Sequence, residues 1–489
     1  MQMQKVKKWW WQLFVTMSVI LVAGLGMGQV AHADTSLQKI KDKGVLTVAT
    51  APDYPPFESQ VNKNGVSTDV GIDIDISKQI AKDLGVKLVI KNMDFDSILV
   101  AVQTGKVDMA IGCINPTDER KQSVDFSNVY YHGGQSFLVT KSNAKKYQSA
   151  SDLEGQKIGA QTGTLQYSLA QQQMMGSKVV GMGKTPDLIF ALKTNKIAAV
   201  GLEEPVAKAY AQNDHDLAVV KANYKTAEGE SGPAIAFAKG NPELVAAVNK
   251  SLDKIAKHHW VNGYLKSAGK YMQENTVDTS MLRYWHYFYN GFLNTTLIAF
   301  VSVFLGIILG VILALMKMSK FKILSWPAIS YIEIVRGTPM MVQVLLVYFG
   351  LGAVINIPAL TAGIIAVSLN SGAYVAEIIR GGINSLDKGQ TEAAKSLGLN
   401  HKDTMRFVIL PQAFKNIWPA LGNEFISVIK ESSIVSIIGV GDLIYELNIV
   451  RADTYRGIAP IVVVMVIYFL MTFILTRGLN YLEGKMNHD

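Results

Sequence analysis

Three long stretches in the second half of the chain contain no charged residue, at 292–316, 337–376 and 457–476. About 20 consecutive apolar residues are enough for a helix to cross the hydrocarbon core of a bilayer. Residues 36 to about 275, in contrast, carry charged side chains throughout. The sequence therefore predicts two unlike parts, a water-soluble first half and an all-α second half that lies within a membrane.

The N-terminus has the pattern of a secretory signal. Lysines 5, 7 and 8 precede an apolar run from Trp9 to about Gly28, and Ala31-His32-Ala33 offers small residues for cleavage. We expect residues 1–33 to be a signal peptide or, because the run is long, an uncleaved membrane anchor. Both alternatives export the domain that follows, predicted at 34–275.

Net charge and cysteine content exclude other classes of protein. The net charge is +8, and many basic residues of the second half fall in segments predicted to face the cytoplasm. Membrane topology accounts for this charge, so no nucleic-acid partner is expected. The single cysteine, Cys113, leaves the exported half without an intramolecular disulfide.

The soluble half has the pattern of two α/β lobes. Strand-like runs at 45–50, 86–90 and 107–111 alternate with helical spacing at 76–84, as in a parallel sheet. Residues 96–107 are echoed by residues 187–197, and each copy is a helix, a polar turn and a strand. Two similar lobes joined by the chain form a cleft, which is suited to closing on a ligand.

Ordered motifs of this half resemble the extracytoplasmic amino-acid-binding proteins of the polar amino acid importer family. The motifs lie at 54–58, 71–75, 93–96, 117–121, 124–127 and 159–164. The resemblance implies a bilobal fold of the periplasmic-binding-protein type and an L-amino acid ligand that is polar or cationic, such as glutamine, arginine, histidine or lysine. No cofactor or metal is expected.

A zwitterionic ligand needs a donor for its carboxylate and an acceptor for its ammonium. The Arg120 guanidinium can hold a carboxylate with two parallel hydrogen bonds, or else it pairs with Asp118 or Asp125. The resemblance places Glu203 at the ammonium, with Glu204 as the alternative. It implies that the remaining contacts come from Tyr54, Phe95, Cys113, Asn115, Thr117, Gln161 and Thr164.

Two departures from the family pattern leave the ligand side chain open. Cys113 and Asn115 stand where the family commonly has small or hydroxylated residues, and Glu203 stands where it usually has an aspartate. The acidic residues Asp53, Glu58 and Asp69 favour a ligand with a polar or cationic side chain, but we expect each of them to be a solvated surface residue.

The second half is predicted to follow a polar linker at 276–284. Five membrane helices are expected near 288–316, 330–352, 358–381, 413–440 and 457–480, within a domain at 285–489. Glu424 lies in the fourth helix, where a charge at mid-membrane costs about 2.5 to 3.5 kcal/mol, so it should face protein or water. Glu377 either contacts a passing ligand or pairs with Arg380.

A polar loop at 382–411 separates the third and fourth predicted helices. Residues 392–397 favour a short helix that begins with Glu392, Ala393 and Ala394, and Gly398 suits a left-handed C-terminal cap. Asn400 with Asp403 can cap the next helix, and Pro411, which follows Leu410, should interrupt that helix. Five crossings from outside place this loop in the cytoplasm.

This half resembles the permease subunit of polar amino acid ABC importers. The motifs are Arg336-Gly337-Thr338-Pro339, residues 370–374, Glu377 with residues 380–382, the loop just described, and residues 430–433. The resemblance implies that the loop couples transport to a separate ATP-binding subunit, and that two copies form the pathway as a homodimer.

The sequence therefore predicts an amino acid importer subunit that fuses a binding protein to a permease, and not an enzyme. It would lie in the cell membrane of a Gram-positive type of envelope, with the binding domain outside. The alternative is a ligand-gated channel or sensor built on the same bilobal domain.

Overall fold

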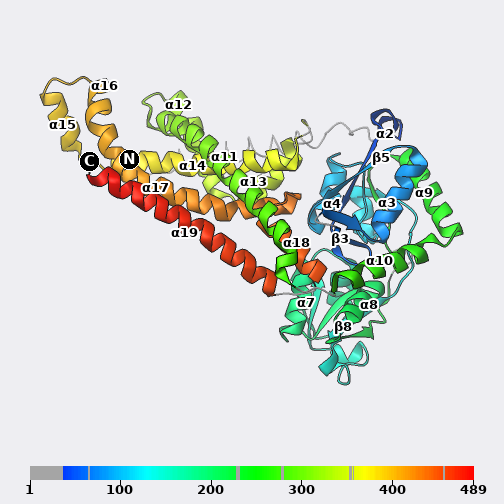
Figure 1. The fold of residues 1–489 in the computed structure, drawn as a ribbon. Coiled ribbons are helices and arrows are strands. Elements are labelled where there is room, and N and C mark those ends of the chain that lie inside the picture. Colours follow the sequence, from blue (N-terminus) through cyan, green and yellow to red (C-terminus); the bar gives the residue numbers. More distant parts are fainter. Residues whose placement is uncertain are drawn as a thin grey trace.

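The computed structural model describes residues 37–63, 66–226, 232–276, 280–351, 355, 357–454 and 458–488. The predicted signal peptide lies outside these residues. Figure 1 shows an α/β body on the right and a body of long helices on the left, joined through α18 (Leu443–Thr454). The predicted fold class is confirmed.

The first lobe is built on a five-stranded mixed sheet in the order β5-β1-β6-β13-β7 and a three-stranded antiparallel sheet in the order β2-β3-β4. β1 occupies the predicted range, and it is buried along most of its length. The elements before the second lobe are α2 (Leu37–Lys43), β1 (Val45–Thr50), β2 (Asp53–Tyr54), β3 (Glu58–Lys63), β4 (Val66–Val70), α3 (Ile72–Leu84), β5 (Lys87–Asn92), α4 (Phe95–Gln103), β6 (Met109–Ala110), α5 (Asp118–Ser123) and β7 (Val124–Phe126).

The second lobe repeats this plan with the sheet order β10-β9-β11-β8-β12. Its elements are β8 (Gln135–Thr140), η2 (Lys141–Asn143), η3 (Ser151–Leu153), β9 (Lys157–Gln161), α6 (Leu165–Gln173), β10 (Lys178–Met182), α7 (Thr185–Lys193), β11 (Ala199–Glu203), α8 (Glu204–Asn213) and β12 (Leu217–Lys221). The chain then returns to the first lobe as β13 (Ala236–Ala238). The sequence echo is thus structural, because α4 and α7 each lead through a turn into a strand.

Both large sheets are mixed and not parallel as predicted. β8 pairs antiparallel with β11 and β12, and β13 pairs antiparallel with β6 and β7. These reversed strands are the ones next to the two crossings between the lobes. The alternation of strands and helices within one lobe does not predict the direction of a strand whose chain has just crossed from the other lobe.

Two helices carry the chain toward the membrane domain. α9 (Pro242–Lys257) packs on α3, and α10 (Trp260–Thr276) contacts both lobes and α18. The predicted linker is largely helical where the structure describes it. α10 reaches Thr276, and η4 (Met281–Tyr284) leads into the first long helix. Residues 277–279 lie outside the described part.

Three helices of the second half are long and apolar enough to span a membrane, and two further bent pairs give up to five spans. The second predicted span, near 330–352, is not one helix, because it consists of parts of two helices bent by 112°. Pro339 interrupts the backbone hydrogen bonds there. The elements are α11 (Trp285–Met318), α12 (Lys322–Gly337), α13 (Met340–Leu345), η5 (Leu346–Gly350), α14 (Ala359–Asn384), α17 (Leu410–Glu431), η8 (Ser432–Ile438), α18 and α19 (Ala459–His488).

The loop between α14 and α17 contains α15 (Lys388–Ser396), α16 (His401–Asp403) and η7 (Thr404–Ile409). Gly398 has φ 85°, and the Asn400 side chain accepts a hydrogen bond from the backbone N–H of Asp403, so both predicted caps are confirmed. Pro411 does not interrupt the helix, contrary to the prediction, because residues 401–438 form one continuous helix. The π-helical turn of η7 precedes the proline and accommodates its missing N–H.

Candidate binding site and membrane charges

The interface between the lobes brings together three predicted site residues. Asn115 Nδ2 of the first lobe donates to Glu203 Oε1 of the second lobe at 3.1 Å. The backbone N–H of Glu203, at the end of β11, donates to the Tyr54 hydroxyl at 3.2 Å. Both lobes therefore contribute to a single polar cluster.

Glu203 is an almost fully buried acid. It is 1% exposed, and its Oε1 atom also accepts a hydrogen bond from Gln166 Nε2 at 3.0 Å. Its Oε2 atom has no hydrogen-bond partner among the described residues. Burial raises the pKa of this carboxyl. A cation at Oε2 would compensate the buried charge.

Glu204, the alternative acid, faces elsewhere. It forms an ion pair with Lys208 of the same helix. It lines a cavity of about 540 Å³ together with Tyr131–Gly134, at one of the crossings between the lobes. The geometry thus favours Glu203 over Glu204 as the acceptor near Asn115.

Arg120 links the lobes from the opposite side of Asn115. Its Nη1 atom donates to the Asn115 carbonyl at 2.9 Å, and its Nη2 atom donates to the Gly163 carbonyl at 2.8 Å. The guanidinium lies 5.6 Å from the centre of the Phe95 ring. Burial lowers the Arg120 pKa to about 10, so the group is a cation at neutral pH.

The ion pairs that were the alternative for Arg120 are absent from the described residues. Asp118 pairs with Lys121, and Asp125 pairs with Lys239. The guanidinium is instead held by two carbonyl oxygens. A ligand carboxylate would be a stronger acceptor for such a donor than a carbonyl.

Three polar site residues hold the local backbone. Thr117 caps α5, and Thr164 caps α6, by accepting the N–H of Arg120 and of Tyr167. Gln161 donates to the Gly183 carbonyl at 3.0 Å. Each side chain thus has a structural partner in addition to its predicted ligand role.

Cys113 lies in a left-handed backbone conformation with φ 48°. Its N–H donates to Asp73 Oδ2 at 2.9 Å, and burial raises the pKa of its thiol. An unreactive thiol and a fixed backbone suit a wall position more than a nucleophile.

The expectation that the acidic residues are solvated was wrong for Glu58. Its side chain is fully buried near Asp73, and neither of its carboxylate oxygens has a hydrogen-bond partner among the described residues. Burial raises the pKa of both carboxyls, that of Asp73 to about 7. Burial likewise raises the pKa of Asp53 to about 7. Asp69 is held by Gln60 and Asn92, each at 2.8 Å. Such acids are hard to find by pattern, because α10 and α18, which lie far along the chain, contact the strands that carry Asp53 and Glu58.

Sequence analysis missed several residues that join the lobes. Lys184 of the second lobe forms an ion pair with Asp94 of the first. Gln166 also donates to Gln135 Oε1 at 2.9 Å, which places both glutamines beside Glu203. Asp94 and Gly163 lie inside quoted motifs, so motif membership was the available signal for those two.

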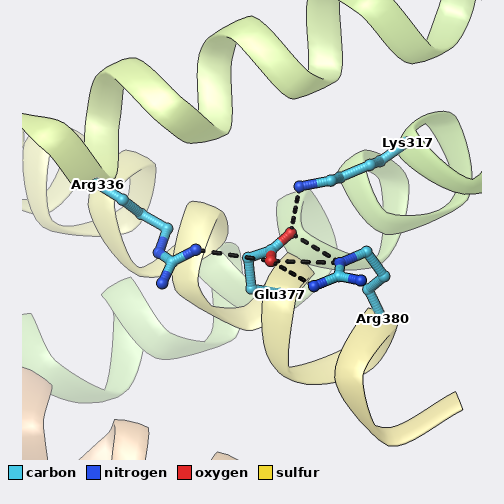
Figure 2. Close-up of polar contacts among 4 residues, drawn as sticks. All are labelled: Lys317, Arg336, Glu377 and Arg380. Atoms are coloured by element: carbon cyan, nitrogen blue, oxygen red, sulfur yellow. Dashed lines mark hydrogen bonds and ion pairs between the residues drawn. The ribbon is translucent and has the colours of Figure 1, made fainter. Parts of the chain in front are cut away.

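Glu377 is the centre of a charge cluster in the membrane domain. Figure 2 shows Lys317, Arg336 and Arg380 converging on its carboxylate from α11, α12 and α14. The N···O distances are 2.6 Å to Lys317, 3.6 Å to Arg336 and 2.9 Å to Arg380. Of the two predicted alternatives, the structure contains the pair with Arg380 and adds two further cations. The cluster ties three helices together.

Glu424 faces protein, as predicted. The Ser371 hydroxyl of α14 donates to Glu424 Oε1 of α17 at 3.1 Å. Figure 1 shows α15 and α16 at the end of the helical body farthest from the lobes. The predicted coupling residues lie in or next to this loop: Glu392, Ala393 and Ala394 in α15, Gly398 between α15 and α16, and Leu410 and Pro411 at the start of α17.

Two family models match the two halves. Bacterial extracellular solute-binding proteins, family 3, match residues 46–267. The inner membrane component of binding-protein-dependent transport systems matches residues 306–488. The chain belongs to the amino acid ABC transporter family, with a binding protein and a permease fused in one polypeptide.

Relatives of the permease half include the arginine transport system permease protein ArtQ of Bacillus subtilis (strain 168). It is 44% identical over 201 residues, which are 41% of this chain and 92% of ArtQ. The probable glutamine ABC transporter permease protein GlnM of the same organism is 36% identical, over 40% of this chain and 92% of GlnM.

The binding half is similar to a solved amino acid ABC transporter substrate-binding protein from Streptococcus pneumoniae bound to L-arginine. The identity is 39%, over 48% of this chain and 97% of that one, with a TM-score of 0.46. By the two family models, the chain is of a transporter type that combines binding and membrane domains.

Proposed function

We propose that this chain captures an L-amino acid outside the cell and forms half of a dimeric import pathway driven by a separate ATP-binding subunit. The observation that carries the proposal is that the interlobe site, the membrane spans and the α15–α16 loop follow one another along the length of the molecule. The interlobe site lies at one end, the spans lie in the middle, and the α15–α16 loop lies at the opposite end (Figure 1).

The ligand would bind between Arg120 and Glu203. Its carboxylate would replace the carbonyl acceptors of the Arg120 guanidinium, and its ammonium would meet Glu203 Oε2. Phe95 and Tyr54 would be the apolar walls. The raised pKa of Glu203 supports this arrangement, because a cationic partner offsets the cost of the buried carboxylate.

A polar or cationic side chain is the proposed ligand class. The acids Glu203, Asp53 and Asp73 lie in or beside the interlobe region, and relatives of the permease half are named for arginine and glutamine transport. A cationic ligand would reduce the repulsion among these buried carboxyls.

The α15–α16 loop would receive the force of ATP hydrolysis. Its helices are short and capped, with Ala394 buried and Leu397 83% exposed. An exposed apolar side chain beside polar helices suits a contact with a soluble subunit. The expected location is the cell membrane, with the lobes outside and this loop in the cytoplasm.

Calorimetric titration of the purified full chain with a panel of amino acids tests the binding step. We expect micromolar affinity for at least one polar or cationic amino acid, and loss of that affinity in Arg120→Ala. Lys121→Ala, next in sequence and paired only with Asp118 in the described ion pairs, is the control. Unchanged affinity in Arg120→Ala would remove Arg120 from the site.

A further inference from the structure

α18 lies across the boundary between the two lobes. It contacts β2 and β3 of the first lobe, α7 of the second lobe and α10. Figure 1 shows it between the lobes and the long helices. A single element of the membrane domain therefore touches both halves of the binding domain.

Contact with the second lobe rests on a buried cation. Arg451 of α18 is 5% exposed, and its Nη2 atom lies 2.6 Å from Asp187 Oδ1 of α7. The two atoms lie at ion-pair distance without the alignment of a hydrogen bond. A buried guanidinium is costly unless it is paired, so α18 depends on Asp187 at this position.

Contact with the first lobe is made by the turn before Arg451. Tyr445, Asn448 and Ile449 face Asp53 and neighbouring residues across a cavity of only about 30 Å³. The same small cavity is lined by Asp94 and Lys184, whose ion pair joins the lobes. α18 thus covers a contact that exists only while the lobes are together.

A hinge motion would separate these two sets of contacts. β2 and α7 belong to different lobes, and lobe opening moves them as rigid bodies relative to each other. α18 can then keep Tyr445 against Asp53 or Arg451 against Asp187, but not both. The complete interface fits one relative position of the lobes, the one in which Lys184 meets Asp94.

We infer that α18 is a sensor of lobe closure, with Arg451 as the residue that recognises the closed position of the second lobe through Asp187. This inference rests on the proposed function, because closure matters to the membrane domain only if the lobes deliver a ligand. α18 follows the helix 401–438, so its position is linked along the chain to the proposed coupling loop.

Ligand-dependent cross-linking tests this inference on the full chain in lipid nanodiscs. Asp187→Cys and Arg451→Cys are combined and treated with a short bismaleimide, because an ion pair that includes a long arginine side chain spans too far for a disulfide between two cysteines. The native Cys113 is buried and has a raised thiol pKa, which keeps it unreactive. Calorimetry on the same sample identifies a bound amino acid.

We expect the bound amino acid to raise the cross-linking yield at least threefold. A pair within the second lobe, Lys193→Cys with Asp214→Cys, is the matched control and should show a constant yield, since its native ion pair does not cross the hinge. An equal yield at 187 and 451 with and without ligand would overturn the inference while binding itself stands. Absence of binding by any amino acid in the unmodified chain would instead overturn the proposed function and the inference with it.

A charge exchange guards against a folding defect. Arg451→Asp alone should weaken the stimulation of ATP hydrolysis at saturating ligand at least tenfold in the complex with the ATP-binding subunit, and it should raise the ligand Kd, because a contact made only in the closed position favours binding. Arg451→Asp with Asp187→Arg should restore the stimulation. Full stimulation in Arg451→Asp would contradict the role of this pair.

Discussion

The substitution Glu203→Gln removes the charge of the proposed ammonium acceptor and keeps its shape. Glu203 Oε1 accepts hydrogen bonds from Asn115 at 3.1 Å and Gln166 at 3.0 Å. A glutamine oxygen can accept both. The substitution also puts an NH₂ group in place of Oε2, which has no hydrogen-bond partner in the described part of the chain. The main change is therefore the electrostatic one.

Binding and stability should respond in opposite directions. Hydrogen bonds to charged groups contribute about 1.5 to 3 kcal/mol. Their loss corresponds to a roughly 10- to 150-fold increase in Kd. In the unliganded chain, burial raises the pKa of Glu203, which means that the carboxylate is disfavoured there. The thermal midpoint of unliganded Glu203→Gln should therefore stay constant or rise.

Calorimetric titration and thermal unfolding of the full chain in nanodiscs measure the two effects. Glu204→Gln is the control, because this neighbouring acid pairs with Lys208 at the crossing between the lobes. Its Kd should change less than threefold. A Kd of Glu203→Gln within twofold of the unmodified chain would refute the assignment of Glu203 to the ligand ammonium.

Three further substitutions test other parts of the account. Gly398→Val places a β-branched residue at φ 85° at a cost of about 1 to 2 kcal/mol, and we expect ATP hydrolysis to continue while uptake falls. The control is Gly398→Asn, which should retain uptake because asparagine tolerates this conformation. Equal uptake in both variants would show that the cap is not needed. Glu377→Gln leaves Lys317, Arg336 and Arg380 without their shared carboxylate, so the thermal midpoint of the chain in nanodiscs should fall. The control is Glu333→Gln, on the exposed face of α12. Equal thermal midpoints for the two variants would contradict a stabilising role of the cluster. Glu58→Gln should reduce the loss of thermal stability between pH 5 and pH 8. Burial raises the pKa of Glu58 and that of Asp73, the latter to about 7, so above about pH 4 the folded chain holds more protons than the unfolded chain. The free energy of unfolding therefore falls as pH rises toward 7. The same dependence of stability on pH in Glu58→Gln and in the unmodified chain would contradict this account.

Local features of the fold could be predicted from the sequence. β1 lies at the predicted 45–50, but its residues do not alternate in exposure as predicted, because five of the six are buried, Thr47 and Thr50 among them. The turn at Gly398 and the cap at Asn400 were predictable because both depend on the chemistry of one residue and its near neighbours. The proposed ligand residues were found through motifs, and the structure gathers Tyr54, Asn115 and Glu203 at the lobe interface.

Features that depend on distant contacts could not be predicted in this way. The strand that carries Glu58 is contacted by α10 and α18 from far along the chain, and its own pattern resembles that of a surface acid. The cations that Lys317 and Arg336 bring to Glu377 arrive from two other helices. The position of α18 depends on contacts such as that with Asp187, which is more than 250 residues away in the sequence.

Uptake of a labelled amino acid by ATP-loaded, right-side-out membrane vesicles tests the central claim most directly. The vesicles come from cells that contain this chain and its ATP-binding subunit, and the label is the amino acid identified by calorimetry. We predict accumulation above the external concentration that requires ATP inside the vesicle and is lost in Glu203→Gln at low substrate concentration. Binding of the amino acid without ATP-dependent accumulation would contradict import and favour a ligand-gated channel or a sensor.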